Sequence, residues 1–128
     1  MTIVHSILFV DDDYEFRKTM KKIFERRGYD FVGAADGIEA LELLSERTFD
    51  LIISDLRMPN LDGIGLMEEI RRQSMDLPII FLTAHGEIES YMDLMNMGAF
   101  DYLNKPISAP EMLRVVQRAL EKEKSGSF

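Results

Sequence analysis

Five short apolar runs, each followed by a stretch with helical spacing, limit the folds that this chain can adopt. Each run is about as long as a β-strand. Several are apolar at successive positions, as strands buried on both faces of a sheet are. The runs occupy residues 7–10, 31–34, 51–54, 79–82 and 100–103. This alternation of strands and helices predicts a parallel sheet with helices on both faces.

The stretches between the runs have apolar residues at helical spacing. Phe16, Met20 and Phe24 recur at intervals of four and define one helix face, and Gly28 follows at the position of a C-terminal cap. The segments D-G-I-E at 36–39 and S-A-P-E at 108–111 are typical of helix starts with a capping box. The inner faces of the four later helices are predicted to hold Leu41 and Leu44, then Ile64, Met67 and Ile70, then Ile88, Met92 and Met95, and finally Leu113, Val116 and Leu120.

Length and composition favour one class of protein and exclude others. With 128 residues we expect one domain at residues 1–122, followed by a flexible tail or the start of a linker at 123–128. No basic leader precedes the first run and no apolar run could cross a bilayer, so we expect a cytoplasmic protein without membrane attachment. There is no cysteine, and the net charge of -8 argues against direct binding of nucleic acid.

Polar residues gather where the predicted strands end. In an open parallel sheet, ligands bind beyond the carboxyl ends of the strands. The residues that follow the first, third, fourth and fifth runs are, in order, Asp11, Asp12 and Asp13; Asp55; Thr83; and Asn104 and Lys105. The second run is followed only by Ala35 and Asp36, so we place it at the outer edge, in the strand order 2-1-3-4-5.

This edge collects carboxylates that repel one another. Two such charges about 4 Å apart repel by roughly 4 kcal/mol at an effective dielectric constant of about 20. A cation relieves the repulsion, and oxygen ligands without cysteine or a nearby pair of histidines favour magnesium over zinc. A carboxylate beside such an ion can act as a nucleophile toward a phosphoryl group, whose charge Thr83 and Lys105 can help to neutralise.

Four segments carry a family resemblance: VDDD at 10–13, SDLRMPNLDG at 54–63, LTAHG at 82–86 and DYLNKP at 101–106. In this order they resemble the receiver domain of bacterial two-component response regulators, and their residues are most similar to those of receivers of the NtrC and DctD kind. The resemblance covers about residues 5–122. It implies a flavodoxin-like (CheY-like) doubly wound α/β fold with a five-stranded parallel sheet and five helices. It also implies a phosphorylation-dependent signalling switch rather than a metabolic enzyme.

The resemblance implies a role for each acid at this edge. A histidine kinase would donate a phosphoryl group to Asp55 in a reaction that requires Mg²⁺, for which Mn²⁺ can substitute. Asp12 and Asp55 would bind the ion directly and Asp11 through water, and the backbone carbonyl of Arg57 would complete the protein ligands. Asp13 lies outside this set and is predicted to cap the following helix.

The resemblance also implies a conformational switch. Thr83 would bind a phosphoryl oxygen, Lys105 would pair with the phosphoryl group, and Tyr102 would turn inward when Thr83 moves. The peptide bond between Lys105 and Pro106 is expected to be cis. The expected partners are a sensor histidine kinase or a phosphotransfer protein, and an output domain or downstream protein on the surface of the fourth helix, fifth strand and fifth helix. Two copies can also form a homodimer on phosphorylation.

Other interpretations of the same residues stay open. Taken singly, each polar residue could be a turn former, a helix cap or a solvated side chain. A phosphatase of the haloacid dehalogenase type would use Asp11 as nucleophile and Asp13 as acid. It would also need a further acidic motif, which the 23 residues after Lys105 lack, and it leaves Asp55 without a role. A flavodoxin that binds flavin would have a Ser/Thr-rich loop after the first run, and a degenerate receiver would lack one of the key residues.

Overall fold

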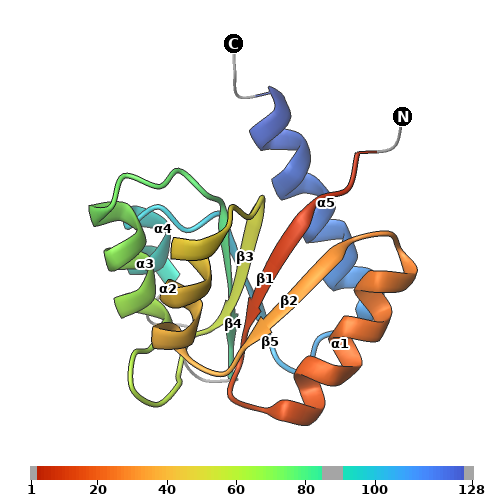
Figure 1. Cartoon of the computed structure of the whole chain (residues 1–128), viewed down its shortest axis with the longest axis horizontal. Helices are drawn as coiled ribbons and strands as arrows, with labels where there is room; N and C mark the ends of the chain where they lie inside the picture. The colour runs from red at the N-terminus through yellow and green to blue at the C-terminus, as the bar shows by residue number, and fades with distance from the viewer. Residues whose placement is uncertain (1–2, 85–90, 126–128) are drawn as a thin grey trace.

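The computed structural model describes residues 3–84 and 91–125, except for the side chains of residues 91 and 122–125. Within this range strands and helices alternate along the chain (Figure 1). The elements are β1 (Ser6–Val10), α1 (Tyr14–Arg26), β2 (Asp30–Ala34), α2 (Gly37–Glu46), β3 (Leu51–Asp55), α3 (Gly63–Arg72), β4 (Ile79–Thr83), α4 (Tyr91–Asn96), β5 (Asp101–Asn104) and α5 (Ala109–Ser125). The strands form one parallel sheet in the order β2-β1-β3-β4-β5, so the predicted doubly wound fold and strand order are confirmed.

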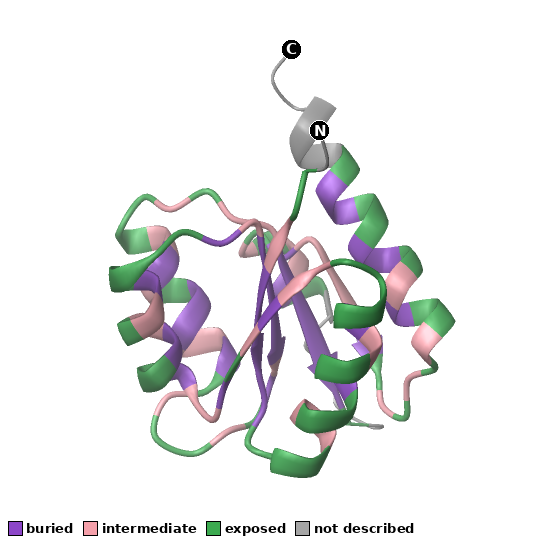
Figure 2. Cartoon of the chain, turned by 45° about the vertical axis from the view of Figure 1, so that its right-hand side comes forward, coloured by how far each residue is buried: buried purple, intermediate pink, exposed green. Residues whose placement is uncertain are grey.

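Helices cover both faces of the sheet. Helices α1 and α5 lie against one face, and α2, α3 and α4 lie against the other (Figure 1). In β1, Ile7 and Phe9 pack toward α1 and α5, whereas Leu8 and Val10 pack toward α2 and α3, because successive side chains of a strand point to opposite faces. Figure 2 shows the central strands buried and the helices buried only on their inner sides. The unbroken apolar runs are therefore strands that are covered on both faces.

Side-chain caps start α1 and α2 at the predicted places. The Asp13 carboxylate accepts a hydrogen bond from the Phe16 amide at 3.2 Å, which confirms Asp13 as the cap of α1. Asp36 accepts from the Glu39 amide at 2.9 Å ahead of α2. The Glu39 carboxylate bonds back to the amide of Ala35, so the reciprocal bond of the capping box falls one residue earlier than in the standard pattern.

Two further helix ends also follow the prediction. After α1, Arg27 caps the helix and Gly28 has a φ of 87°, a left-handed conformation that glycine adopts without strain. Ahead of α5, the hydroxyl of Ser108 accepts from the amide of Glu111 at 3.2 Å. The local signals in the sequence therefore set where these helices begin and end.

The strands extend further toward their carboxyl ends than the apolar runs do. Asp55, Thr83 and Asn104 are the last residues of β3, β4 and β5 and not the first residues beyond them. The ladder continues because the Leu56 amide donates to Leu82 at 2.9 Å and the Lys105 amide donates to Thr83 at 2.8 Å. At the other end, β5 begins at residue 101 rather than at residue 100 as predicted. The pleat of the strands therefore sets the direction of these polar side chains.

The fourth helix differs from its predicted inner face. Ile88 lies outside the described residues. Met92, which was predicted to face inward, is 64% exposed, and Leu94, which lies on the opposite side of α4, is buried. Each residue turns a helix by about 100°, so a helix that buries Leu94 must turn Met92 outward. In the part of the chain that the structure describes, no helix has both the length and the apolar character that crossing a membrane requires.

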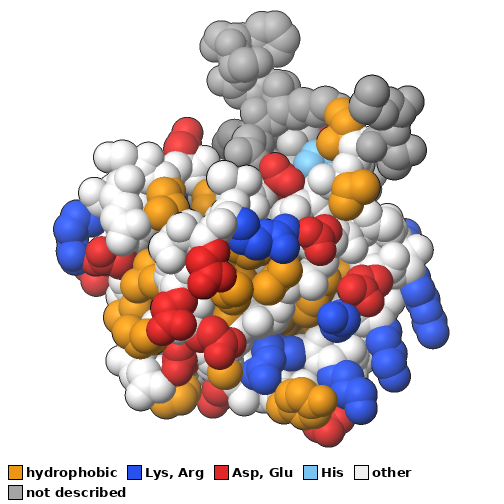
Figure 3. Space-filling model, viewed as in Figure 1, with side chains coloured by type: hydrophobic (Ala, Val, Ile, Leu, Met, Phe, Trp, Pro, Cys, Tyr) orange, Lys and Arg blue, Asp and Glu red, His pale blue; other side chains and the backbone are white. Residues whose placement is uncertain are grey.

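The negative charge is not spread evenly over the surface. Lys and Arg side chains line α1, whereas the acidic side chains of Glu39, Glu42 and Glu46 gather over α2 (Figure 3). The sequence of α2 contains no basic residue. The charged faces of these two helices therefore have opposite sign despite the net charge of -8.

Candidate functional site

The carboxyl ends of β1, β3, β4 and β5 meet at one edge of the sheet, and the pleat divides their polar residues between two faces. Asp11, Asp55 and Lys105 each lie two positions after a residue that packs toward α1 and α5. Thr83 and Asn104 each lie two positions after a residue that packs toward α2, α3 and α4. Residues two apart in a strand share a face, so the acids and the lysine lie on one side of this edge and the hydroxyl and amide on the other.

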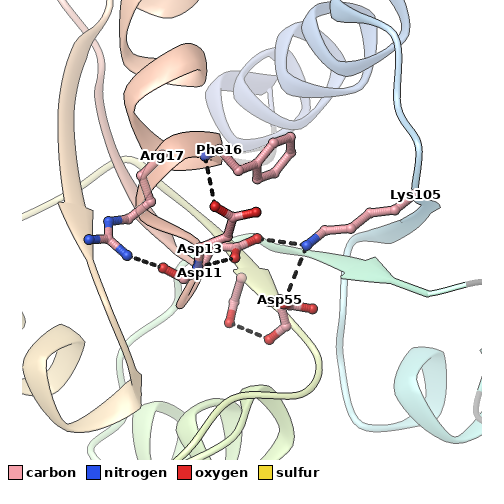
Figure 4. Close-up of polar contacts among 7 residues, drawn as sticks. Asp11, Asp13, Phe16, Arg17, Asp55 and Lys105 are labelled. Carbon is pink, nitrogen blue, oxygen red and sulfur yellow. Dashed lines mark hydrogen bonds and ion pairs between the residues drawn. The ribbon is translucent and has the colours of Figure 1, made fainter.

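Lys105 joins the two acids of the first face (Figure 4). Its ammonium lies 2.8 Å from Oδ2 of Asp11, 3.3 Å from Oδ2 of Asp55 and 4.9 Å from the centre of the Phe16 ring. Burial disfavours the charged ammonium, but the hydrogen bond to Asp11 and the charges of both acids outweigh this, so the pKa of Lys105 is raised. Lys105 therefore supplies a lasting positive charge to the site.

Asp11 is fully buried, and both of its carboxylate oxygens have partners. Oδ1 accepts from the backbone amide of Asp13 at 2.9 Å, and Oδ2 accepts from the ammonium of Lys105. The backbone is held as well, because the Asp11 amide donates to Ala34 at 3.0 Å and the Asp11 carbonyl accepts from the Arg17 guanidinium. The position of Asp11 is therefore fixed, and its carboxylate is committed to groups of the protein.

Asp55 is the more accessible of the two acids. Its side chain is 14% exposed. Burial raises the pKa of Asp55 and the charge of Asp11 adds to this, whereas the charge of Lys105 and hydrogen bonds from Lys105 and the Arg57 amide oppose it; the net shift is upward. The hydroxyl of Ser54 donates to the Asp55 carbonyl at 2.9 Å and holds the backbone. Asp55 thus carries its charge in a poorly hydrated place, where a further cation would stabilise it.

Asp11, Asp12 and Asp55 form a cluster that could hold a metal ion. One carboxylate oxygen from each lies within 4.8 Å of the others. The donor set consists of hard oxygen atoms, which fits Mg²⁺ rather than zinc. Asp11 is fully buried and both of its oxygens accept hydrogen bonds, so the more accessible Asp12 and Asp55 are better placed to bind an ion directly. The ligand role of the Arg57 carbonyl stays a prediction.

On the second face, the Thr83 hydroxyl donates to Oδ1 of Asn104 at 2.8 Å. Thr83 is 1% exposed, whereas Asn104 is exposed. The two residues are register partners in β4 and β5, which brings their side chains together. Tyr102, two residues before Asn104, is half-buried and packs against the core beneath α2, α3 and α4. The two predicted switch residues, Thr83 and Tyr102, therefore lie on the same face of neighbouring strands.

The turn after Asp55 folds back closely on the strand. The Gly63 amide donates to the Leu56 carbonyl at 3.1 Å. A Cβ atom at Gly63 would lie 2.5 Å from the Asp55 carbonyl oxygen and 2.8 Å from the Phe81 ring. Only glycine allows this approach, so Gly63 packs α3 directly against the backbone that carries Asp55.

A hollow opens beside the Lys105 ammonium. It is lined by Asp13, Phe16, Ala84, Lys105, Pro106 and Ile107. The peptide bond between Lys105 and Pro106 on its rim is cis, as expected. The hollow therefore reaches Lys105 from the side of α1 and the loop that follows β5, whereas Asp11 and Asp55 are not among its lining residues.

Two residues of the site have contacts that sequence reasoning missed. Phe16 was assigned only to the inner face of a helix, but its ring also lies against the ammonium of Lys105 in a cation–π contact. Asn104 was noted only as a polar residue near a strand end, but it is the partner of Thr83. Asn104 directly precedes Lys105 and follows the fifth apolar run. This position was the only feature of the sequence that could have indicated Asn104 as a partner of Thr83.

Comparison with known proteins identifies the family of this chain. The response regulator receiver domain family matches residues 7–117. Regulatory protein AtoC of Escherichia coli K12 is 36% identical over 121 residues, which are 94% of this chain and 26% of AtoC. The C4-dicarboxylate transport transcriptional regulatory protein DctD of Rhizobium meliloti is 36% identical over 124 residues, which are 97% of this chain and 27% of DctD. The chain thus spans about a quarter of the length of these two relatives.

Solved structures give the same result. A response regulator receiver domain protein from Clostridium thermocellum has a TM-score of 0.88 and 30% identity, covering 94% of this chain and 97% of its own. The chemotaxis response regulator CheY4 of Vibrio cholerae has a TM-score of 0.85 and 33% identity, covering 92% of this chain and 100% of its own. The predicted CheY-like fold is therefore confirmed, and this chain belongs to the receiver domain family of two-component response regulators.

Proposed function

We propose that Asp55 accepts a phosphoryl group from the phosphohistidine of a sensor kinase or phosphotransfer protein, in a reaction that requires Mg²⁺. Membership of the receiver family supports this role in general. The observation that supports Asp55 in particular is the bridge that Lys105 makes between Asp55 and Asp11, with an oxygen of Asp12 within 4.8 Å of both acids. A nucleophile, a fixed cation and a set of metal ligands meet at this point.

The proposed reaction is an in-line phosphoryl transfer. An oxygen of the Asp55 carboxylate attacks phosphorus while the bond from phosphorus to the donor imidazole nitrogen breaks, and the electron pair of that bond stays on the nitrogen. The product is an acyl phosphate on Asp55. Lys105 offers N–H groups to the phosphoryl oxygens, and the Asp55 side chain, which is 14% exposed, is open to the donor. The same arrangement supports slow loss of the phosphoryl group to water.

Four residues would hold the metal ion. Asp12 and Asp55 would bind it directly, the Arg57 carbonyl would add a third ligand, and Asp11, which is fully buried, would act through water. When bound, Mg²⁺, or Mn²⁺ in its place, supplies charge that neutralises the phosphoryl oxygens. Lys105 and the ion would then share the neutralisation of the transferring group.

Phosphorylation of Asp55 would act on the opposite face through Thr83. The new group adds charge and acceptor oxygens, to which the Thr83 hydroxyl can donate. Movement of Thr83 would open space for Tyr102, which already packs into the core on that face. The surface of α4, β5 and α5 would then change shape. A shift from 1:99 to 99:1 between two states requires about 5.5 kcal/mol of differential stabilisation.

The proposal includes partners and domain limits. Residues 1–122 would form the receiver, and 123–128 a tail or the start of a linker to an output domain. An output domain or downstream protein would bind the surface of α4, β5 and α5, and phosphorylation can also drive homodimerisation there. The AtoC and DctD relatives, which are about four times longer than the matched region, support an output domain in the intact protein. The cytoplasmic location stays a prediction.

A haloacid dehalogenase phosphatase is the less well supported alternative. It would need Asp13 to act as an acid beside Asp11. The Asp13 carboxylate instead accepts a hydrogen bond from the Phe16 amide and caps α1. The bridge from Lys105 also runs from Asp11 to Asp55, a residue that the phosphatase interpretation does not use.

Mass spectrometry after incubation with acetyl phosphate and Mg²⁺ tests the proposal. We expect one phosphoryl adduct on the unmodified sequence, no adduct on Asp55→Asn, and no adduct when a chelator removes the ion. Asp13→Asn is the matched control, because asparagine caps a helix about as well as aspartate and the residue lies outside the metal cluster. An adduct that persists in Asp55→Asn but disappears in Asp11→Asn would instead support the phosphatase.

A further inference from the structure

We propose that Asn104 is a positioning residue that holds the Thr83 hydroxyl away from Asp55 while Asp55 is unmodified, and so sets how readily the receiver commits to its phosphorylated state. We call the hydrogen bond between Thr83 and Asn104 the latch. The inference deepens the proposed function and rests on it, since it takes the phosphoryl group on Asp55 as the second partner of Thr83.

The latch is built by strand register. Thr83 and Asn104 are paired in β4 and β5, and both end their strands on the face of α2, α3 and α4. The donor and acceptor atoms are 2.8 Å apart, a normal distance for a hydrogen bond from a hydroxyl. Asp55 lies on the other face of the pleat at the end of β3, so the latch directs the hydroxyl away from the acid cluster.

Burial makes the latch necessary in the unmodified protein. Thr83 is 1% exposed, and a buried hydroxyl without a partner is unfavourable. Among the residues that the structure describes, no buried side-chain polar atom lacks a hydrogen-bond partner, and Asn104 provides the partner for Thr83. Asn104 itself is exposed, so an exposed side chain supplies the acceptor for the buried hydroxyl of Thr83.

The latch and the phosphoryl contact exclude each other because a threonine hydroxyl has a single proton to donate. In the unmodified protein the Thr83 proton goes to Asn104. To donate to a phosphoryl oxygen on Asp55, Thr83 must first release Asn104. The free energy of the latch is therefore subtracted from the free energy with which the phosphoryl group engages Thr83.

The expected effect is modest and measurable. The net contribution of one neutral hydrogen bond corresponds to a factor of about two to ten in an equilibrium constant. Removing the acceptor at Asn104 should therefore tighten the binding of a phosphoryl mimic by about this factor. Because Asn104 is exposed, its truncation leaves the core of the sheet intact.

The test is a double-mutant cycle on the affinity of the intact domain for beryllium fluoride in the presence of Mg²⁺, measured by isothermal titration calorimetry. The variants are Asn104→Ala, Thr83→Ala and the two combined, with Gln117→Ala on α5 as a control for truncating an exposed amide. Affinity for Mg²⁺ alone is measured for each, because a merely structural role of Asn104 in shaping the acid cluster would change it, and thermal melting shows that each variant is folded.

We expect Asn104→Ala to bind beryllium fluoride about two- to tenfold more tightly than the unmodified sequence, with unchanged affinity for Mg²⁺. The gain should vanish in the Thr83→Ala background, and Gln117→Ala should have no effect. Equal or weaker binding by Asn104→Ala, or the same gain without Thr83, would overturn the latch. If the unmodified sequence itself does not bind beryllium fluoride, the proposed function fails, and this outcome is distinct from failure of the latch alone.

Discussion

The two ends of the sheet carry similar charged residues, but the environment of the charges differs. At the carboxyl end, Lys105 pairs with Asp11, which is 0% exposed, and with Asp55. At the amino end, Arg47 pairs with Asp30 at 2.6 Å, and their side chains are 39% and 44% exposed. The hydrogen bond from Arg47 lowers the pKa of Asp30, whereas burial raises the pKa of Asp55. The charge of Asp30 is therefore stabilised by its surroundings, whereas the charge of Asp55 is disfavoured by them.

The members of the amino-end cluster are hydrogen-bonded to one another. Arg47 donates to Ser6 and Asp30, Ser6 donates to Asp30, and the Asp50 carboxylate accepts from the Ser6 amide at 2.8 Å. The guanidinium also lies 4.7 Å from the centre of the Phe49 ring. The cluster therefore ties the starts of β1 and β2 to the segment before β3. A charged cluster thus becomes a candidate for chemistry when burial leaves the charge of one member poorly compensated.

The largest difference between the two ends should appear when the cation is removed. Lys105→Met should destabilise the domain by about 3 kcal/mol, because it leaves the buried carboxylate of Asp11 without its ion pair. Arg47→Met should cost about 1 kcal/mol or less, because its partner is exposed to water. Urea unfolding followed by circular dichroism measures both. Equal losses would show that the two clusters do not differ in the way described.

The second prediction concerns the acids. Without Mg²⁺, Asp55→Asn should raise the melting temperature, because the folded protein disfavours the charge of Asp55, whereas Asp30→Asn should lower it. Each kcal/mol shifts the melting temperature of a domain of this size by about 4 °C.

Mg²⁺ at about 100 times its dissociation constant should stabilise the unmodified sequence by about 2.7 kcal/mol, and Asp55→Asn by much less. Differential scanning calorimetry with and without the ion measures these melting temperatures. Equal shifts in Asp55→Asn and Asp30→Asn would show that the two acids do not differ in environment.

The third prediction is the pH dependence of these differences. The pKa of Asp30 is lowered, so its contribution is present above its unfolded value of 3.8 and is lost as pH falls through the folded pKa. The advantage of the unmodified sequence over Asp30→Asn should therefore shrink below about pH 4. The pKa of Asp55 is raised, so stability is lost as pH rises through its folded pKa, and the metal-free advantage of Asp55→Asn should grow above about pH 4. Unfolding titrations from acid to neutral pH measure the stability of the unmodified sequence minus that of each variant. This difference should rise with pH for Asp30→Asn and fall with pH for Asp55→Asn.

The smallest expected effect concerns the ring beneath Lys105. A cation over an aromatic face gains about 0.5–1 kcal/mol at partly exposed sites, so Phe16→Leu should slow adduct formation with acetyl phosphate about two- to fivefold. Phe16→Tyr keeps the ring and is the matched control, for which the rate should stay near that of the unmodified sequence. A slower rate in both variants would assign the effect to packing of α1 rather than to the ammonium.

The sheet and the polar edge could be predicted because they depend on local patterns. The buried runs, the caps at Asp13 and Ser108, and the acids and lysine at strand ends all follow from residue type and spacing along the chain. The strand order also followed, because the second run ends with few polar residues.

Contacts between distant strands could not be predicted in the same way. The partner of Thr83 depends on the register of β4 and β5, which no single run encodes. The approach of Gly63 to Asp55 depends on how a turn folds back, and the outward direction of Met92 depends on which residue of a short helix is buried. These features required the three-dimensional arrangement of elements.

The division of the carboxyl edge between two faces separates the residues proposed to receive the phosphoryl group from those proposed to pass on its presence to the surface. The groups proposed to carry out the chemistry lie toward α1 and α5, and Thr83, Asn104 and Tyr102 lie toward α2, α3 and α4. One layer of backbone stands between them, and the strand ends that carry both sets form its rim. If Asn104 acts as proposed, its substitution would change the sensitivity of the switch while leaving the groups around Asp55 in place. A receiver built in this way can acquire a new threshold without acquiring a new active site.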